Sequence, residues 1–214
     1  SGYSRYGDDR LREECGVFGV FGHPEAGAIT ALGLHALQHR GQEACGIVSV
    51  DGSDFYARRG IGHVAQVFSG PPIFAELPGT MASGHVRYST TGGQGLRNVQ
   101  PLHADLARGA FSIAHNGNIS NAMALKRELV NKGAIFQSSS DTEVIIHLIA
   151  TSRYPTLLDR FVDALLDGFP PTCGLGVKRR AEVIGEHRDG REVSLTAAIV
   201  AHDQRLRYSP KPRG

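Results

Sequence analysis

The chain has 214 residues, of which 41% are apolar, and this suits a globular protein with one sizeable domain or two small ones. Its 23 basic and 21 acidic residues give a formal net charge of +2, too balanced to indicate a nucleic-acid-binding surface or binding to an anionic membrane. No stretch approaches the roughly 20 apolar residues of a membrane span, and the polar N-terminal segment lacks the apolar core of a secretory signal. We therefore expect a cytoplasmic protein whose partner is a small molecule or another protein.

The three cysteines, Cys15, Cys45 and Cys173, are odd in number and widely spaced, without a C-x-x-C pair. This pattern argues against a disulfide framework and against a structural zinc site. His35 and His39 are spaced like zinc ligands on a helix, but the glutamate of H-E-x-x-H is missing between them. We therefore expect no metal site, and we interpret the cysteines as buried thiols or, in one case, a catalytic residue.

The N-terminal segment divides into a polar part and an apolar part. Residues 1–14 are polar, charged or glycine-bearing, and we expect them to form an extension outside the core. The run 15–22 is short, apolar and prone to β structure, with glycines where a neighbouring backbone or a ligand could come close. It predicts a buried strand with Cys15 at its start.

The elements predicted after this strand mix helices with strands. Apolar residues at helical spacing predict a first helix over 26–38, with residues 39 and 40 in its last turn and Gly41 as its cap. Short apolar runs predict three further strands, at 46–50, 84–88 and 111–115. Because these elements follow no regular βαβ order, the sequence favours an α+β sandwich over a doubly wound sheet.

Three more helices are predicted in the second half of the chain. One covers 121–131 and another covers 157–166. The helix between them has the clearest start, because Ser140 and Glu143 form an S-x-x-E capping box directly before an apolar run. The N-terminus of this helix should therefore be well fixed.

The last part of the sequence, 167–214, differs in character from the rest. Nine basic residues stand against six acidic ones, and arginine and proline are enriched. We interpret this segment as a divergent tail, which a shifted reading frame or a truncated gene would explain. Within it, Asp189 and Gly190 suit a type I′ turn and predict a hairpin between 181–186 and 192–201.

Several residues fit the chemistry of amide hydrolysis, which needs a nucleophile, a base and hydrogen-bond donors for an oxyanion. Cys15 offers the thiol. If cleavage made Cys15 the first residue, its own α-amine, with a pKa of about 8, could take the proton. Asn116 and Gly117 directly follow a predicted strand, so the Asn116 amide and the Gly117 N–H could converge on a developing negative charge.

Two charged residues could hold the backbone groups of an amino-acid substrate such as glutamine. Arg87 stands at a predicted strand end and can pair with a carboxylate through two hydrogen bonds, with the Thr90 hydroxyl nearby in sequence. Asp141, on the first turn of the third helix, could hold the ammonium group. Each feature taken singly also has a structural explanation, such as a buried small side chain, a turn or a favourable helix start.

Five motifs occur together and in order along the chain. They are ECGVFG at 14–19, LQHRGQE at 37–43, GHVRYST at 84–90, AHNGN at 114–118 and SSDTE at 139–143. In this combination, over about residues 13–166, the sequence resembles the glutaminase domain of the amidophosphoribosyltransferase family. The resemblance implies a four-layer αββα sandwich of the N-terminal-nucleophile hydrolase type, incomplete at its C-terminal end. It also implies a propeptide-like extension at 1–14, removed autocatalytically, and a class II glutamine amidotransferase domain at 15–166.

The resemblance also implies roles for individual residues. Cys15 would be the nucleophile and the base-bearing N-terminus, and Asn116 and Gly117 would form the oxyanion hole. Arg87 and Asp141 would clamp the substrate's backbone groups. Arg40 and Gly41 would border the glutamine pocket, and Tyr88 and Thr90 would help to shape it. Glutamine is the implied substrate, and no cofactor is expected for its hydrolysis. The ammonia would serve to make 5-phosphoribosylamine in the first step of purine synthesis.

The family's second domain, a phosphoribosyltransferase, has no counterpart after residue 166 of this sequence. Phosphoribosyl pyrophosphate would be bound only by that domain. Mg²⁺ and, in some relatives, an iron–sulfur cluster are implied for family regions that this sequence lacks. Assembly into a homo-oligomer is compatible with the resemblance. Two alternatives stay open: an amidotransferase or amidohydrolase with another ammonia acceptor, and a catalytically inactive fragment.

Overall fold

The computed structural model describes residues 15–41, 43–70, 72–88, 95–107, 109–116, 119 and 121–168, and three strands between 184 and 201. The predicted extension at 1–14 and most of the tail lie outside these residues. The helices and strands, in chain order, are β1 (Gly16–Phe21), α1 (Ala26–Ala36), a 3₁₀ helix η1 (Gln38–Arg40), β2 (Ala44–Asp51), β3 (Asp54–Ile61), α2 (Val64–Val67), α3 (Pro72–Ala75), β4 (Met81–Arg87), a 3₁₀ helix η2 (Leu96–Asn98), β5 (Leu102–Leu106), β6 (Gly109–Asn116), α4 (Ala122–Asn131), α5 (Asp141–Thr151), α6 (Leu157–Gly168), β7 (Ile184–Glu186), β8 (Glu192–Ser194) and β9 (Thr196–Ala201).

The first sheet is antiparallel, with strand order β1-β4-β2-β3. Helix α1 packs on one of its faces, and Gly84 allows this close approach because a Cβ there would come within 2.7 Å of Leu34 Cδ1. Val86 belongs to the buried cluster on the same face. Since side chains alternate along a strand, His85 and Arg87 project from the opposite face of β4.

The second sheet has strand order β5-β6-β9 and is also antiparallel. Phe111 and Ile113 of β6 are fully buried and form a cluster with Val144, Ile145 and Ile149 of α5. Alternation along β6 therefore leaves Ala114 and Asn116 on the other face of this sheet.

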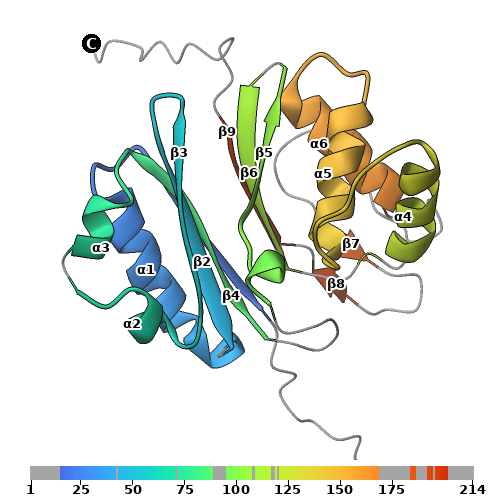
Figure 1. Ribbon diagram of the computed structural model, residues 1–214. Coiled ribbons are helices and arrows are strands. Elements are labelled where there is room, and N and C mark those ends of the chain that lie inside the picture. Colours follow the sequence, from blue (N-terminus) through green and yellow to red (C-terminus); the bar gives the residue numbers. More distant parts are fainter. Residues whose placement is uncertain are drawn as a thin grey trace, which may run out of the picture.

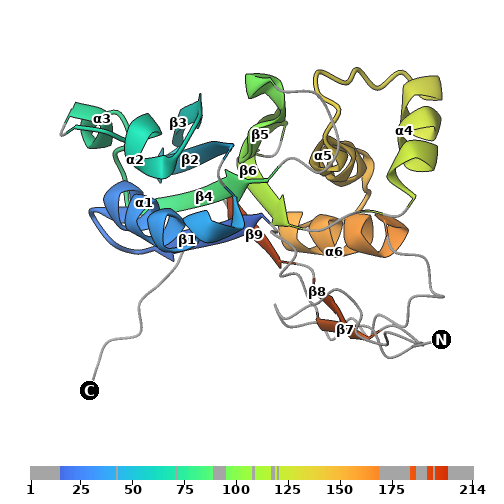
Figure 2. The ribbon, with the colours of Figure 1, turned by 90° about the horizontal axis from the view of Figure 1, so that it is seen from below.

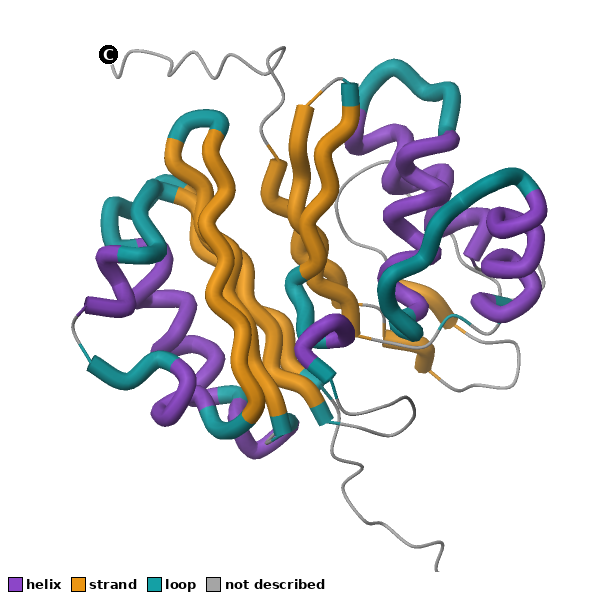
Figure 3. The backbone as a smooth tube through the Cα atoms, in the orientation of Figure 1, coloured by secondary structure: helices purple, strands orange, loops and turns teal. Residues whose placement is uncertain are grey.

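The two sheets lie side by side, with α1, α2 and α3 outside the first sheet and α4, α5 and α6 beyond the second (Figure 1). Figure 2 and Figure 3 show the same separation of the helices into two groups. The rings of Phe55 in β3 and His103 in β5 meet between the sheets, with centroids 4.7 Å apart. The predicted α+β class is confirmed, and both sheets are antiparallel. Among the described helices, none has the length and apolar character needed to span a membrane.

The first helix differs from its prediction at the C-terminal end. Helix α1 ends at Ala36, and residues 38–40 form the 3₁₀ helix η1 instead of a last α-helical turn. Gly41 is extended, with φ −160° and ψ 115°, and so it is not a left-handed cap. Glycine is needed at this position because there is no room for a side chain: a Cβ at Gly41 would come within 2.7 Å of the Arg87 carbonyl carbon.

The other predicted elements are present, and two strands were missed. The strand predicted at 15–22 corresponds to β1, but it is not buried as predicted, because it lies at the edge of its sheet and only Gly16 in it is buried. The predicted strands at 46–50, 84–88 and 111–115 correspond to β2, β4 and β6, and the three later helices correspond to α4, α5 and α6. Strands β3 and β5 were not predicted. The tail hairpin is divided: β7 pairs with β8, whereas β9 pairs with β6, from Asn116↔Thr196 to Phe111↔Ala201.

Candidate active site

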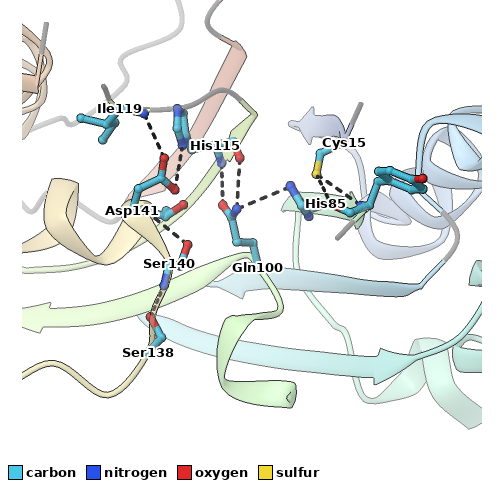
Figure 4. Close-up of polar contacts among 10 residues, drawn as sticks. Cys15, His85, Gln100, His115, Ile119, Ser138, Ser140 and Asp141 are labelled. Atoms are coloured by element: carbon cyan, nitrogen blue, oxygen red, sulfur yellow. Dashed lines mark hydrogen bonds and ion pairs between the residues drawn. The ribbon is translucent and has the colours of Figure 1, made fainter. Parts of the chain in front are cut away.

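Cys15 directly precedes β1 and lies next to the end of β4. The pairing Gly16↔Val86 puts Cys15 beside Arg87. A Cβ on Gly16 would point toward Val86 and Leu37, on the face that α1 covers. Because side chains alternate along a strand, the Cys15 side chain is on the opposite face, which looks toward the second sheet. Its sulfur is 3.4 Å from the Tyr88 backbone nitrogen and 3.7 Å from the Tyr88 carbonyl oxygen (Figure 4). The thiol is therefore held at the strand ends and only partly buried.

The Cys15 thiol is protonated at neutral pH in this environment. Burial raises its pKa, and the Tyr88 backbone hydrogen bond and the Arg87 charge only partly oppose this effect. A nucleophilic Cys15 consequently needs a base that can take its proton. The buried histidines His85 and His115 are poor bases, since burial lowers the pKa of both.

Two predicted site residues converge on the carbonyl oxygen of Cys15 from different elements. The side-chain amide nitrogen of Asn116, at the end of β6, lies 2.6 Å from this oxygen. Arg40 Nε, from η1, lies 3.3 Å from the same oxygen. The fold thus brings together residues that are 25 and 101 positions from Cys15 in the sequence.

Arg87 ends β4, and neighbouring segments contact its backbone. Its register partner in β2 is Ala44, and its carbonyl oxygen accepts a hydrogen bond from the Glu43 N–H at 3.2 Å. Gly41 packs on the other side of the Arg87 main chain, where any larger residue would collide. Gly41, the residue directly after η1, therefore borders Arg87.

Asp141 stands at the first position of α5, with its side chain 23% exposed. Its Oδ2 accepts a hydrogen bond from the Ile119 N–H at 3.1 Å, and its Oδ1 lies 3.9 Å from His115 Nδ1 (Figure 4). The Asp141 charge also acts weakly on the Cys15 thiol, whose pKa it raises. The carboxylate is thus held beside β6, at the same end of the molecule as Cys15.

Helix α5 begins as predicted, but Glu143 does not complete the expected capping box. Ser140 is the N-cap, and its hydroxyl accepts a hydrogen bond from the Thr142 N–H at 3.3 Å. Buried Glu143 instead reaches further back, accepting hydrogen bonds from the backbone of Gln137 at 2.8 Å and of Ser138 at 2.7 Å. It therefore folds the preceding loop against the helix that carries Asp141.

Asn98 holds the same loop from the other side. Its amide nitrogen donates to Ser139 Oγ at 2.9 Å, and its carbonyl oxygen accepts from the Ser139 N–H at 3.0 Å. Sequence reasoning missed Asn98, because nothing in the local pattern around residue 98 connects it with a loop 41 positions later.

The remaining predicted site residues are described only in part or not at all. Gly117 and Thr90 lie outside the described residues, so their predicted roles stay predictions. Tyr88 is described and contacts Cys15 through its backbone. Within the described ranges, no group of three or more His, Cys, Asp or Glu residues is arranged to hold a metal ion.

Three buried polar residues that the sequence did not point to, His85, Gln100 and His115, lie directly behind the site. His85 and His115 are 0% and 2% exposed, and Gln100 is 7% exposed. Burial, the charge of a protonated His115 and the Arg87 charge lower the pKa of His85 to about 3. The His85 side chain is therefore neutral in the folded protein at any pH near 7.

Buried His85 should make the protein sensitive to mild acid. Below about pH 6.5 the unfolded chain binds a proton at His85, whereas the folded chain does so only near pH 3, so stability falls as the pH is lowered through this range. We expect His85 alone to reduce the free energy of unfolding by about 2 kcal/mol between pH 7 and pH 5. Urea denaturation at both pH values, on the wild type and on His85→Asn, measures this effect. Equal losses of stability in the two proteins would contradict it.

Comparison with known proteins supports the sequence motifs. Residues 85–165 match a family model described as a glutamine amidotransferase domain. The amidophosphoribosyltransferase of Rhizobium etli is 59% identical over 73% of this chain and 32% of its own length. The chain thus spans about a third of the length of this relative.

A second relative and a solved structure support the same family. The amidophosphoribosyltransferase of Lacticaseibacillus casei is 53% identical, over 65% of this chain and 72% of that protein. A solved structure described as the allosteric regulatory enzyme of purine biosynthesis superimposes with a TM-score of 0.70 at 41% identity, covering 86% of this chain and 35% of the other. On these similarities, and with the glutamine amidotransferase domain matched within it, the chain belongs to the amidophosphoribosyltransferase family.

Proposed function

We propose that this chain hydrolyses the side-chain amide of glutamine, with Cys15 as the nucleophile. The observation that carries the proposal is the convergence of Asn116 and Arg40 on the Cys15 carbonyl, with Arg87 next along the sheet. A thiol, two cationic side chains and an amide donor at one place are the groups that acyl transfer from an amino-acid amide needs.

The base in this proposal is the α-amine of Cys15 itself, set free by removal of residues 1–14. Such amines have pKa values of about 8, so roughly a tenth is unprotonated at pH 7 and can accept the thiol proton. The raised pKa of Cys15 makes this transfer necessary, and the lowered pKa values of His85 and His115 make those histidines weaker candidates.

The reaction then proceeds through a thioester. The Cys15 sulfur attacks the amide carbon of glutamine, the α-ammonium returns its proton to the leaving nitrogen, and ammonia departs. Water, deprotonated by the same amine, then attacks the thioester, and its proton returns to the Cys15 sulfur as glutamate leaves. Besides glutamine and water, these proposed steps use only groups of the protein.

Asn116 is the proposed side-chain donor of the oxyanion hole. Its amide nitrogen carries two hydrogens, so one can stay on the Cys15 carbonyl while the other points at the oxyanion. The Gly117 N–H is the proposed second donor.

The substrate's own charges would be matched by charges of opposite sign. Arg87 is the proposed partner of the α-carboxylate, and Asp141 is the proposed partner of the α-ammonium group. Arg40 and Gly41 would border the pocket, and Tyr88 and Thr90 would help to shape it.

We further propose that the two sheets and their outer helices form the four-layer αββα sandwich of N-terminal-nucleophile hydrolases. The final ammonia acceptor in this proposal is phosphoribosyl pyrophosphate, bound by a second domain, with 5-phosphoribosylamine as the product in purine synthesis. It is supported by relatives named amidophosphoribosyltransferase and by similar solved structures whose names mention purine biosynthesis and phosphoribosylpyrophosphate. Another acceptor and an inactive fragment are the competing possibilities. A cytoplasmic location and a homo-oligomeric state stay predictions from the sequence.

The proposed function is tested by measuring ammonia and glutamate released by the protein once its mass shows that residues 1–14 have been removed. We expect equal amounts of both products from L-glutamine and at least tenfold slower release from glutaramate, which lacks the α-ammonium group that Asp141 would bind. Release from both compounds at the same rate would contradict the clamp, and absence of release from glutamine would overturn the function.

A further inference from the structure

Gln100 lies between the two sheets, immediately before β5. Its main chain packs against β2, where a Cβ on Gly46 would come within 2.3 Å of the Gln100 carbonyl oxygen. Because the colliding atom belongs to the backbone, only glycine fits at position 46 without displacing this segment. The main chain of Gln100 is therefore seated on the first sheet.

The side chain of Gln100 reaches back to the second sheet. The pairing of β5 with β6 ends at Leu102↔Ile113, and the same register carried two residues further sets Gln100 opposite His115. There the Gln100 side chain replaces the main-chain ladder: its Oε1 accepts from the His115 N–H at 2.7 Å, and its Nε2 donates to the His115 carbonyl at 3.1 Å. This pair of bonds fixes the backbone directly before Asn116.

A third contact joins Gln100 to β4. The two bonds to His115 determine the orientation of the amide, and one N–H of Nε2 is left for His85 Nε2, 3.5 Å away (Figure 4). A neutral His85 can accept this hydrogen bond. His85 stands two residues before Arg87 on the same face of β4.

We propose that Gln100 is a positioning residue for the oxyanion donor, which ties the end of β6 to the first sheet so that the Asn116 amide faces Cys15. The proposal rests on the proposed glutaminase function. Without these bonds β6 would be paired near His115 only on its β9 side. A displacement of the donor by about 1 Å can reduce a rate roughly 100-fold.

Gln100→Leu tests the proposal, because it keeps the approximate size of the side chain and removes all three polar contacts. We expect kcat for glutamine hydrolysis by the full chain to fall 10- to 100-fold and KM to change less than threefold, since an oxyanion donor acts mainly in the transition state. The matched control is Gln66→Leu, which removes an exposed hydrogen bond to the His63 N–H in α2 and should leave both constants unchanged. Gln100→Met, with a more adaptable side chain, is the second variant if the first does not fold.

The outcomes separate this role from a purely structural one. A folded Gln100 variant with kcat within twofold of the wild type would overturn the proposal, as would a loss carried by KM alone. Hydrogen exchange at the His115 amide gives a readout without turnover, and we expect at least tenfold faster exchange in the variant but not in Gln66→Leu. A wild type that releases no ammonia would refute the proposed function. The His115 exchange rates would then decide whether Gln100 holds β6, and equal rates in the wild type and the Gln100 variant would show that it does not.

Discussion

Replacing Cys15 with alanine should abolish ammonia release from glutamine while the fold stays intact. The variant keeps Arg87 and Asn116 but has no atom that can form the thioester, so we expect a loss of at least about 1,000-fold in kcat. The thiol contacts the protein through the Tyr88 backbone at 3.4 and 3.7 Å and is only partly buried, so little stability should be lost. Ammonia release and circular dichroism on the same sample measure both effects.

Cys45→Ala is the matched control for this substitution. Cys45 lies in β2 on the α1-facing side of the first sheet, is 1% exposed, and burial raises its pKa to about 12. A protonated thiol in the core should not take part in hydrolysis, so we expect activity within about twofold of the wild type. Activity that survives in Cys15→Ala, or disappears only in Cys45→Ala, would show that Cys15 is not the nucleophile.

Asn116→Ala should give the second largest effect, with kcat reduced by roughly 100- to 1,000-fold and KM for glutamine nearly unchanged. Removal of one oxyanion donor typically costs this much, because the donor acts on charge that develops only in the transition state. Steady-state kinetics of ammonia release measure both constants. The 2.6 Å contact between the Asn116 amide and the Cys15 carbonyl places this donor beside the residue that carries the thiol.

Asn131→Ala provides the control for an asparagine-to-alanine change away from the site. Asn131 is the exposed last residue of α4 and should leave the kinetics unaffected. If Asn116→Ala instead raised KM with kcat preserved, Asn116 would bind the ground state of the substrate and would not be an oxyanion donor.

Site residues could be predicted from the sequence where they stand at the end of a strand or the start of a helix. Cys15, Arg87 and Asn116 all stand at strand termini that apolar runs made visible, and Asp141 stands at a helix start marked by Ser140. Their assembly into one place could not be read from spacing, because Cys15 and Asn116 are 101 positions apart and stand at strands of two different sheets.

Residues that act through register were not predictable from local patterns. Gln100 bonds to His115 because the β5–β6 register opposes them, and that register depends on a strand that was itself missed. The alternation of Leu102, Ala104 and Leu106 with polar residues could have revealed β5, although the run is only five residues long. Strand β3 is harder to detect, because it is an edge strand that carries charged residues, such as Arg58, which pairs with Glu76 at 3.0 Å.

Glu143 shows how a correct local motif can have a different partner. The S-x-x-E pattern predicted a bond back to Ser140, but the carboxylate instead bonds to Gln137 and Ser138. The loop before α5 is folded back and held by Asn98, a tertiary contact that offers Glu143 better-placed donors. The helix start was therefore predictable, whereas the loop that orients Asp141 was not.

The most direct test of the proposed mechanism is the intact mass of the protein, determined on the sample whose glutamine hydrolysis is measured. The α-amine of Cys15 can act as the base only when residues 1–14 have been removed, because in the uncleaved chain that nitrogen is part of a peptide bond. We predict that hydrolysis is found only in the species whose mass corresponds to a chain that begins at Cys15. Full activity in a sample that retains all fourteen preceding residues would contradict the mechanism.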